Sequence, residues 1–369
     1  MWLLLVFRNL KNDAPRFLAA VAGVAFAALL MAFEAGLLVG FSHAASRVID
    51  SIEADVWLVR RGTRAFDLGF GVDRDLKHHL SAERSIRAAD EVTVGWTTYL
   101  GPLGQPMSVQ VVGIGKQLEN RVRSGAASGP SVQQFSTDRS YASALGVDPG
   151  SRAEVGGHLL ISGSYLDGFA SFMGTPFINT DLPTSRMVLG FPTRYTSFVA
   201  AKFASGVNHD DAIARLRDRL PHLEVISSFE FSWRSRLYWL LQTGAGGALV
   251  LCTLLGFAIG LAIVSQTIYS LTMDRIDEFA TLKAIGAPLS LLFGMVLVQA
   301  LICTAVGALV GLIAVQGVAA AAQYLVPWCE QPWWISLVIP LLLLPMSFMA
   351  ALVAARPAMK LEPAKAFRA

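Results

Sequence analysis

The sequence predicts an α-helical membrane protein with four transmembrane helices, one before and three after a large α+β extracytoplasmic domain. Composition is the first observation behind this prediction: the 369 residues are 54% hydrophobic and only 15% charged, whereas soluble domains contain roughly 25% charged residues. Distribution is the second, because charged residues gather between positions 43 and 236 and leave long uncharged runs on both sides. Together they exclude a disordered chain and an ordinary water-soluble enzyme. The net charge of +3 gives no reason to expect nucleic acid as a partner.

Each predicted span is a run with at most one charged residue that exceeds the roughly 20 helical residues needed to cross a bilayer. Within the first span, Glu34 is the only charged residue. The second run is longer than one bilayer thickness, so we expect part of it to project into water as a stalk. In chain order, the predicted segments are an amphipathic surface helix (1–16), the first span (17–42), the extracytoplasmic domain (43–236), the second span with its stalk (237–273), a short helix (274–287), the third span (288–326), the fourth span (333–355) and a tail (356–369).

Lysine and arginine near the span ends predict the orientation, because short cytoplasmic segments are enriched in both residues. The link between the third and fourth spans contains neither. Both termini and the loop 274–286 are therefore predicted to be cytoplasmic, with residues 43–236 on the outer side. The cations that agree with this arrangement are Arg8, Lys11, Arg16, Arg275, Lys283, Arg356, Lys360, Lys365 and Arg368.

Residues 43–236 have the composition of a soluble domain, with 21 Lys and Arg, 20 Asp and Glu and all six histidines. A helix is predicted from Asp210 to Leu220, since Asn208 can cap its start and Pro221 ends it. Apolar runs separated by Gly and Pro predict strands. The mixture indicates a small α+β domain in two lobes. The predicted strands are Ala54–Val59, Glu91–Leu100, Ser108–Ile114, His158–Ser162 and Ser197–Phe203.

The segment 274–287 combines helix formers with Gly286, which can end a helix, and is followed by Pro288, which suits the start of the next one. Two interpretations are equally open from the residues alone. The helix docks into a groove of a partner protein, or it lies on the membrane surface with solvated charges. The apolar residues that recur at helical spacing are Ile276, Phe279, Leu282 and Ile285.

Three stretches of the sequence resemble a known family. The most specific is VSQTIYSLTMDRIDEFATLKAIGA at 264–287; the others are APRFLAAVAGVAFAALLM at 14–31, followed by ADVWL at 54–58, and ARPAMKLEPAKAFR at 355–368. They are similar to the signature, the first span and the closing segment of FtsX-like ABC transporter permeases, above all the DevC branch related to MacB. The expected topology is also that of this family.

The resemblance implies a homodimeric permease subunit of the bacterial inner (cytoplasmic) membrane with a MacB-like periplasmic domain. Two copies of a separate cytoplasmic ABC ATPase would bind to it and would hold ATP and Mg, while this chain is expected to bind no cofactor and no metal. MacB-type members work by mechanotransmission, and DevC-type permeases also engage a periplasmic adaptor and an outer-membrane duct. Segment 274–287 corresponds to the family's coupling helix, and the implied ATPase contacts are Arg275, Glu278, Phe279, Leu282 and Lys283.

Glu34 departs from the neutral or amide residue expected in DevC-type first spans. A carboxylate inside a span is a candidate functional residue, so Glu34 and Met31 are candidates for lining a dimer cavity or contacting a substrate such as haem. The simpler interpretation, a carboxylate accommodated among small neighbouring residues, is favoured. Helix packing, including the dimer seam, is predicted at the small-residue pairs Gly36/Gly40, Gly256/Gly260 and Gly307/Gly311.

The expected function is export or extraction of a substrate such as a lipid, a glycolipid or haem, driven by ATP hydrolysis in the partner. Two alternatives stay open: FtsX-type signalling to a cell-wall hydrolase, and lipoprotein release resembling that of LolC and LolE. A membrane enzyme is not expected, because no catalytic constellation is present in the sequence. The nearest phosphate-loop candidate, Val111–Gln117, lacks the first glycine and the Ser/Thr after Lys116.

Overall fold

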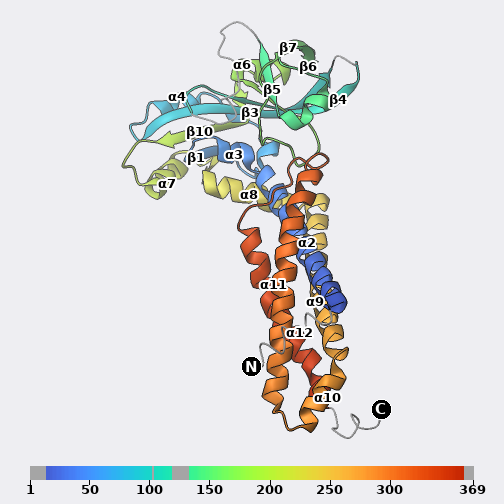
Figure 1. The fold of residues 1–369 in the computed structure, drawn as a ribbon. Coiled ribbons are helices and arrows are strands. Elements are labelled where there is room, and N and C mark those ends of the chain that lie inside the picture. Colours follow the sequence, from blue (N-terminus) through green and yellow to red (C-terminus); the bar gives the residue numbers. More distant parts are fainter. Residues whose placement is uncertain (1–13, 102–103, 119–132, 361–369) are drawn as a thin grey trace. The chain divides into compact units, whose positions relative to one another are not determined.

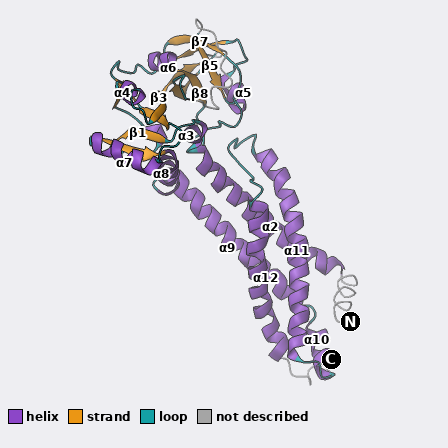
Figure 2. Cartoon of the chain, turned by 90° about the vertical axis from the view of Figure 1, so that its left-hand side faces the viewer, coloured by secondary structure: helices purple, strands orange, loops and turns teal. Residues whose placement is uncertain are grey.

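The structure is a computed structural model that describes residues 14–101, 104–118 and 133–360 (Figure 1). The predicted surface helix 1–16 falls almost entirely outside these residues, as does the end of the tail. The chain divides into two compact units, which we call the sheet unit and the helical unit. The sheet unit consists of Gly40–Gly247 with Val326–Trp328, and the helical unit of Met1–Val39, Ala248–Leu325 and Cys329–Ala369. All described strands belong to the sheet unit (Figure 2).

The sheet unit contains a nine-stranded sheet with the order β11-β1-β10-β3-β4-β8-β5-β7-β6 and a small pair, β2-β9. Its strands are β1 (Val56–Arg60), β2 (Val72–Asp73), β3 (Ile86–Leu100), β4 (Pro106–Ile114), β5 (Gln134–Thr137), β6 (Arg152–Val155), β7 (His158–Ser162), β8 (Phe177–Asp181), β9 (Tyr195–Thr196), β10 (Phe198–Phe203) and β11 (Leu223–Ser227). Its helices are α3 (Arg47–Ser51), α4 (Leu76–Ser81), α5 (Ala142–Leu145), α6 (Leu182–Val188), α7 (His209–Arg219) and α8 (Ser228–Leu241), with 3-10 turns η1 (Phe66–Leu68) and η3 (Arg139–Tyr141).

The long strand β3 is shared by two lobes. Its first half pairs with β10, so that β11, β1, β10 and β3 form an open antiparallel sheet. Its second half pairs with β4, and its end pairs with β6, where Tyr99 lies opposite Val155. Strands β3, β4, β8, β5, β7 and β6 are therefore joined edge to edge in a closed ring. The ring leaves few free strand edges in this lobe, which limits unwanted strand pairing.

The open sheet is buried on both faces because helices cover each of them. Along β1, Trp57 belongs to one apolar cluster and Leu58 to the other, as the alternation of side chains in a strand requires. The cluster around Trp57 includes Ile49 of α3 and Phe231 of α8. Residues of α4 and α7 complete the cluster around Leu58. At the start of α7, the side chain of Asn208 accepts hydrogen bonds from the next helical N–H groups, as the sequence predicts.

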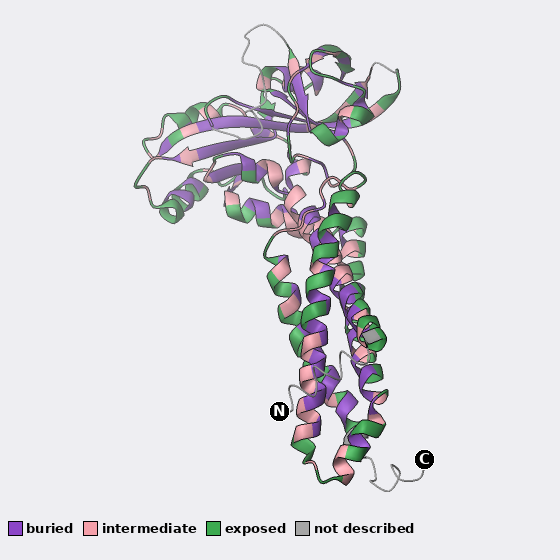
Figure 3. Ribbon diagram, viewed as in Figure 1, coloured by how far each residue is buried: buried purple, intermediate pink, exposed green. Residues whose placement is uncertain are grey.

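The helical unit contains four helices that are long and apolar enough to cross a membrane. Large apolar side chains such as Leu251, Ile313 and Leu341 are exposed on them by 62–66% (Figure 3). Apolar side chains exposed to this extent suit contact with lipid, whereas on a soluble protein they would favour aggregation. The helices are α2 (Ala14–Ala44), α9 (Gly244–Met273), α10 (Ile276–Ala284), α11 (Leu289–Ala322) and α12 (Ile335–Lys360), of which α10 is the short one.

Helices α9 and α11 approach α2 closely where they carry glycine. A Cβ atom at Gly260 would lie 2.6 Å from the sulfur of Met31, and one at Gly307 would lie 2.7 Å from the Cβ of Val24. At Gly311 the nearest atom, 2.4 Å away, would be the carbonyl oxygen of Ala25. Such distances exclude any larger residue without a shift of the helices, so these glycines set the spacing of the bundle.

The predicted second span, 237–273, differs from the structure, which divides it between α8 and α9. Thr243 begins α9: its hydroxyl accepts a hydrogen bond from the N–H of Gly246 at 3.2 Å and donates one to the carbonyl of Trp239 at 2.6 Å. A Cβ at Gly246 would lie 1.9 Å from that same carbonyl oxygen. The run of uncharged residues is continuous, but its Gly-rich stretch favours a break in the helix. The part before residue 242 is therefore a separate helix of the sheet unit.

Replacing Gly311 by Ala is expected to destabilise the full-length protein by about 1–3 kcal/mol, the usual cost of inserting a methyl group into a packed interior. The measurement is the thermal unfolding midpoint in detergent. Gly317→Ala is the matched control, because it makes the same change on the same helix where a Cβ would have no neighbour within 4 Å. Equal midpoints for the two variants would contradict the close approach of α11 to α2.

Candidate functional site

The short helix α10 lies between the spans α9 and α11, and local chemistry sets its ends. Arg275 occupies the N-cap position. Asp277 and Glu278 in the first turn interact favourably with the positive end of the helix dipole. At the other end Gly286 has a φ of +94°, in the left-handed region where glycine is favoured, and it stops the helix as the sequence predicts.

One face of α10 is buried within the helical unit. Phe279 is 3% exposed and belongs to the apolar core of the unit, and Arg275 is 5% exposed. Both are expected ATPase contacts, and that assignment stays a prediction; in this structure their side chains are buried against their own chain. Helical spacing shows which residues share a face, but it does not show which face turns towards the neighbouring spans. Leu282 and Lys283, also expected contacts, are half-buried.

The other face of α10 is open, and we call it the α10 surface: Asp277, Glu278, Thr281 and Ile285. Their spacing places them on neighbouring turns of one side. Ile285, the C-cap residue of α10, is 80% exposed. Thr281 donates its hydroxyl hydrogen bond to the carbonyl of Asp277 at 2.9 Å, within the helix. The α10 surface therefore offers two carboxylates beside one apolar side chain.

The first-span candidates Glu34 and Met31 are packed against α9. Met31 is fully buried with its sulfur beside Gly260, so it is a packing residue in this structure and not a contact for an open cavity. The Cγ of Glu34 is the nearest atom to a Cβ built at Gly256, 3.1 Å away. Glu34 is half-buried. These contacts favour the structural interpretation of this carboxylate.

The remaining small-residue positions also make contacts within the chain. At Gly36 the side-chain amide of Gln331 would collide with any Cβ, and that amide donates a hydrogen bond to the carbonyl of Ala32 at 3.2 Å. Gly40 is buried. Four of the six predicted glycines (Gly256, Gly260, Gly307 and Gly311) pack against α2. The helix packing predicted for them is thus internal, and their use as a dimer seam stays a prediction.

A polar cluster links α3 to α8, and sequence reasoning did not detect it. Asp50 accepts hydrogen bonds from Arg236 at 2.7 Å and from Ser232 at 2.5 Å. Ser46 donates to Asp50 at 2.7 Å and accepts from Arg236 at 2.8 Å. Because about 180 residues separate the two sides, no local pattern in the sequence signals the cluster. It joins the segment that follows α2 to the helix that precedes α9.

Buried carboxylates tie other helices of the sheet unit to its strands. Asp90 on β3 forms an ion pair with Lys77 of α4 at 2.9 Å, and Glu91 pairs with Arg74 and with Arg186 of α6. Such buried charges are tolerated only when they are paired. These residues hold the fold, and nothing in their spacing along the sequence predicts the pairing.

Asp67 lies where η1 meets α8. Its carboxylate accepts a hydrogen bond from the indole of Trp239 at 2.9 Å and another from the side chain of Gln110. Burial raises the pKa of Asp67, because the charged form loses its hydration, and the two hydrogen bonds oppose that rise. Asp67 thus fixes the last turn of α8 to the body of the sheet unit.

Within the described ranges, no group of three or more His, Cys, Asp or Glu side chains could hold a metal ion. The cysteines Cys252, Cys303 and Cys329 are free thiols. The arrangement of α10 is therefore the feature with the clearest chemical meaning: a helix between two spans whose open side could receive a protein partner.

Comparison with known proteins gives one family match, which covers residues 250–363: the FtsX-like permease C-terminal family. No curated protein matches the chain. Among solved structures, the periplasmic region of MacB from Actinobacillus actinomycetemcomitans is similar at 13% identity and a TM-score of 0.37, over 49% of this chain and 92% of that one. The extracellular domain of the noncanonic ABC-type transporter YknZ from Gram-positive bacteria is similar at 12% identity and a TM-score of 0.35, over 47% and 98%.

The family match begins within α9, includes all of α10 and α11, and extends past the end of α12. Over residues 250–363, about a third of its length, the chain is therefore similar to the C-terminal part of FtsX-like permeases.

Proposed function

We propose that this chain is the permease subunit of an ABC export complex that works by mechanotransmission. The observation that carries the proposal is the α10 surface, an open acidic and apolar helix face inside the segment that matches the FtsX-like permeases. In this proposal a separate cytoplasmic ATPase holds ATP and Mg and binds α10. Its conformational change then moves the sheet unit, which exports or extracts a small hydrophobic substrate such as a lipid, a glycolipid or haem.

Ile285 supplies the affinity expected of such a contact. Its side chain is 80% exposed, and removing an isoleucine of this exposure from water into a pocket stabilises a complex by about 1.5–3 kcal/mol. Asp277 and Glu278 would favour a partner with a basic rim and would speed and orient its association. Phe279 contributes indirectly, because its buried side chain holds α10 in place against the helical unit.

The Asp50 cluster joins the two helices of the sheet unit that follow α2 and precede α9 in the sequence. Both α3 and α8 pack on the same face of the open sheet, where Ile49 and Phe231 share one apolar cluster. Because Asp50 and Arg236 join these two helices, a displacement of either neighbouring span would act on a single rigid element. This supports transmission by movement of a preformed body, without a requirement for refolding within the sheet unit.

The proposal includes the wider assembly implied by the resemblance to DevC-type permeases. The chain would form a homodimer with two ATPase copies in a bacterial inner membrane, with both termini cytoplasmic and residues 43–236 periplasmic. A periplasmic adaptor and an outer-membrane duct would complete the export path. The charge distribution at the span ends supports this orientation.

Ile285→Ser is expected to weaken binding of the cognate ATPase by about 10- to 100-fold, because the apolar area buried in the contact is lost. Binding is measured with both proteins purified and the permease in lipid nanodiscs. Phe229→Ser is the matched control, since Phe229 on α8 is equally exposed, at 80%, but lies in the sheet unit. Unchanged affinity for Ile285→Ser would remove α10 from the ATPase contact.

Asp50→Ala is expected to leave ATPase binding intact and to abolish the ATP-dependent change in the sheet unit. Hydrogen–deuterium exchange of the open sheet, with and without ATP, reports that change in the reconstituted complex. Asp167→Ala breaks a comparable ion pair, the exposed Arg139–Asp167 contact at 3.1 Å, and should behave as wild type. If Asp50→Ala retains the full ATP-dependent response, force does not pass through this cluster.

A further inference from the structure

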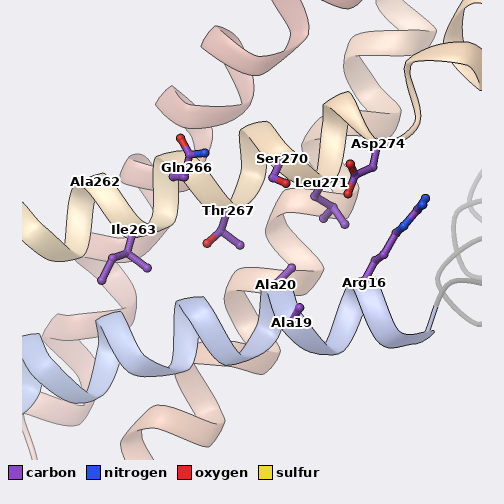
Figure 4. Close-up of a pocket in the computed structure, with 10 residues that line it drawn as sticks. All are labelled: Arg16, Ala19, Ala20, Ala262, Ile263, Gln266, Thr267, Ser270, Leu271 and Asp274. Carbon is purple, nitrogen blue, oxygen red and sulfur yellow. The ribbon is translucent and has the colours of Figure 1, made fainter.

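A cavity of about 560 Å³ lies between the first part of α2 and the last part of α9 (Figure 4). Its lining changes in character from one end to the other. Arg16 and Asp274 stand at one end, the polar side chains of Ser270, Thr267 and Gln266 follow along α9, and Ala262 lies towards the other end. The cavity is thus charged at one end, polar in the middle and apolar at the other end.

Helix length places the charged end at the level of lipid headgroups. From Gly244 to Val264, α9 is almost entirely apolar, and these 21 residues of the helix span about 31 Å at 1.5 Å per residue. That length matches the roughly 30 Å of bilayer hydrocarbon. The remaining residues of α9, from Ser265 to Met273, therefore lie beside the headgroups, together with Arg16 near the start of α2.

The charges at this end have no counter-ions in the chain as described. Neither Arg16 nor Asp274 forms a salt bridge with another residue in the ranges 14–101, 104–118 and 133–360. In Figure 4 the two side chains extend from different helices at the same end of the cavity. A guanidinium group binds phosphate through paired N–H donors, and a carboxylate accepts hydrogen bonds from an ammonium group. One cation beside one anion is complementary to a zwitterion.

We propose that this cavity binds a phospholipid with a zwitterionic headgroup carrying a primary ammonium, that is, a phosphatidylethanolamine. The phosphate binds Arg16, the ammonium binds Asp274, and the ester region meets the hydroxyl and amide groups of α9. The acyl chains leave past Ala262 into the bilayer. A headgroup with a net negative charge would face repulsion from Asp274, and a quaternary ammonium has no N–H to donate. The leaflet concerned is the inner one, which rests on the orientation given under the proposed function.

The experiment measures lipid retained by the purified full-length chain in detergent, by native mass spectrometry, after incubation with an equimolar mixture. The mixture contains phosphatidylethanolamine, phosphatidylglycerol and phosphatidylcholine with identical acyl chains. Wild type is expected to retain phosphatidylethanolamine over phosphatidylglycerol by about two- to fivefold, the ratio that one partly exposed ion pair provides. Asp274→Asn should abolish this preference, and Arg16→Gln should lower retention of all three lipids.

Two matched controls carry the same chemical changes outside the cavity. Asp218→Asn and Arg356→Gln alter exposed residues that do not line the cavity and should retain lipid as wild type does. An unchanged lipid ratio in Asp274→Asn would overturn the proposal. The proposal would also be overturned if the variants changed the oligomeric mass without changing the bound lipid. That result would assign the cavity to a second copy of the chain. No ATPase is present in this assay, so its outcome and that of the coupling experiment are independent.

Discussion

Close packing of α2 against α9 and α11 is the constraint on which the helical unit depends. Lipid tails are as apolar as the helices, so the hydrophobic effect does not drive helices together within a bilayer. Contact must come from close approach, and glycines at 256, 260, 307 and 311 provide it. Helix α2 is therefore held closely by two neighbours at once. Helix α9 also carries exposed leucines, and near its end it lines the cavity that it shares with α2.

The sequence was sufficient for features that depend on local chemistry. Uncharged runs located the spans, Asn208 and Pro221 bounded α7, and Gly286 ended α10, because each signal acts within a few residues. The break between α8 and α9 was missed because the gaps between charges do not distinguish a helix from a glycine-rich turn. The burial of Phe279 on α10 could not be predicted for a different reason: burial depends on neighbouring helices far along the chain.

The polar contacts of the sheet unit also could not be predicted from the sequence, because their partners lie far apart along the chain. Asp50 meets Arg236 across 186 positions, and Glu91 meets Arg186 across 95. No periodicity or spacing connects such partners in a single sequence. What the sequence does provide is the strand pattern that brings them together, since β3 is long enough to serve two lobes at once. The carboxylates on β3 then attach α4 and α6 to that shared strand.

The interruption at residues 242 and 243 has a consequence for the mechanical connection between α8 and α9. A continuous helix transmits torsion, because each peptide is bonded to the one four residues away. Between α8 and α9 that ladder is replaced by a capped turn at Thr243. The backbone hydrogen bonds that would carry a rotation of α9 about its own axis into α8 are therefore interrupted at this joint.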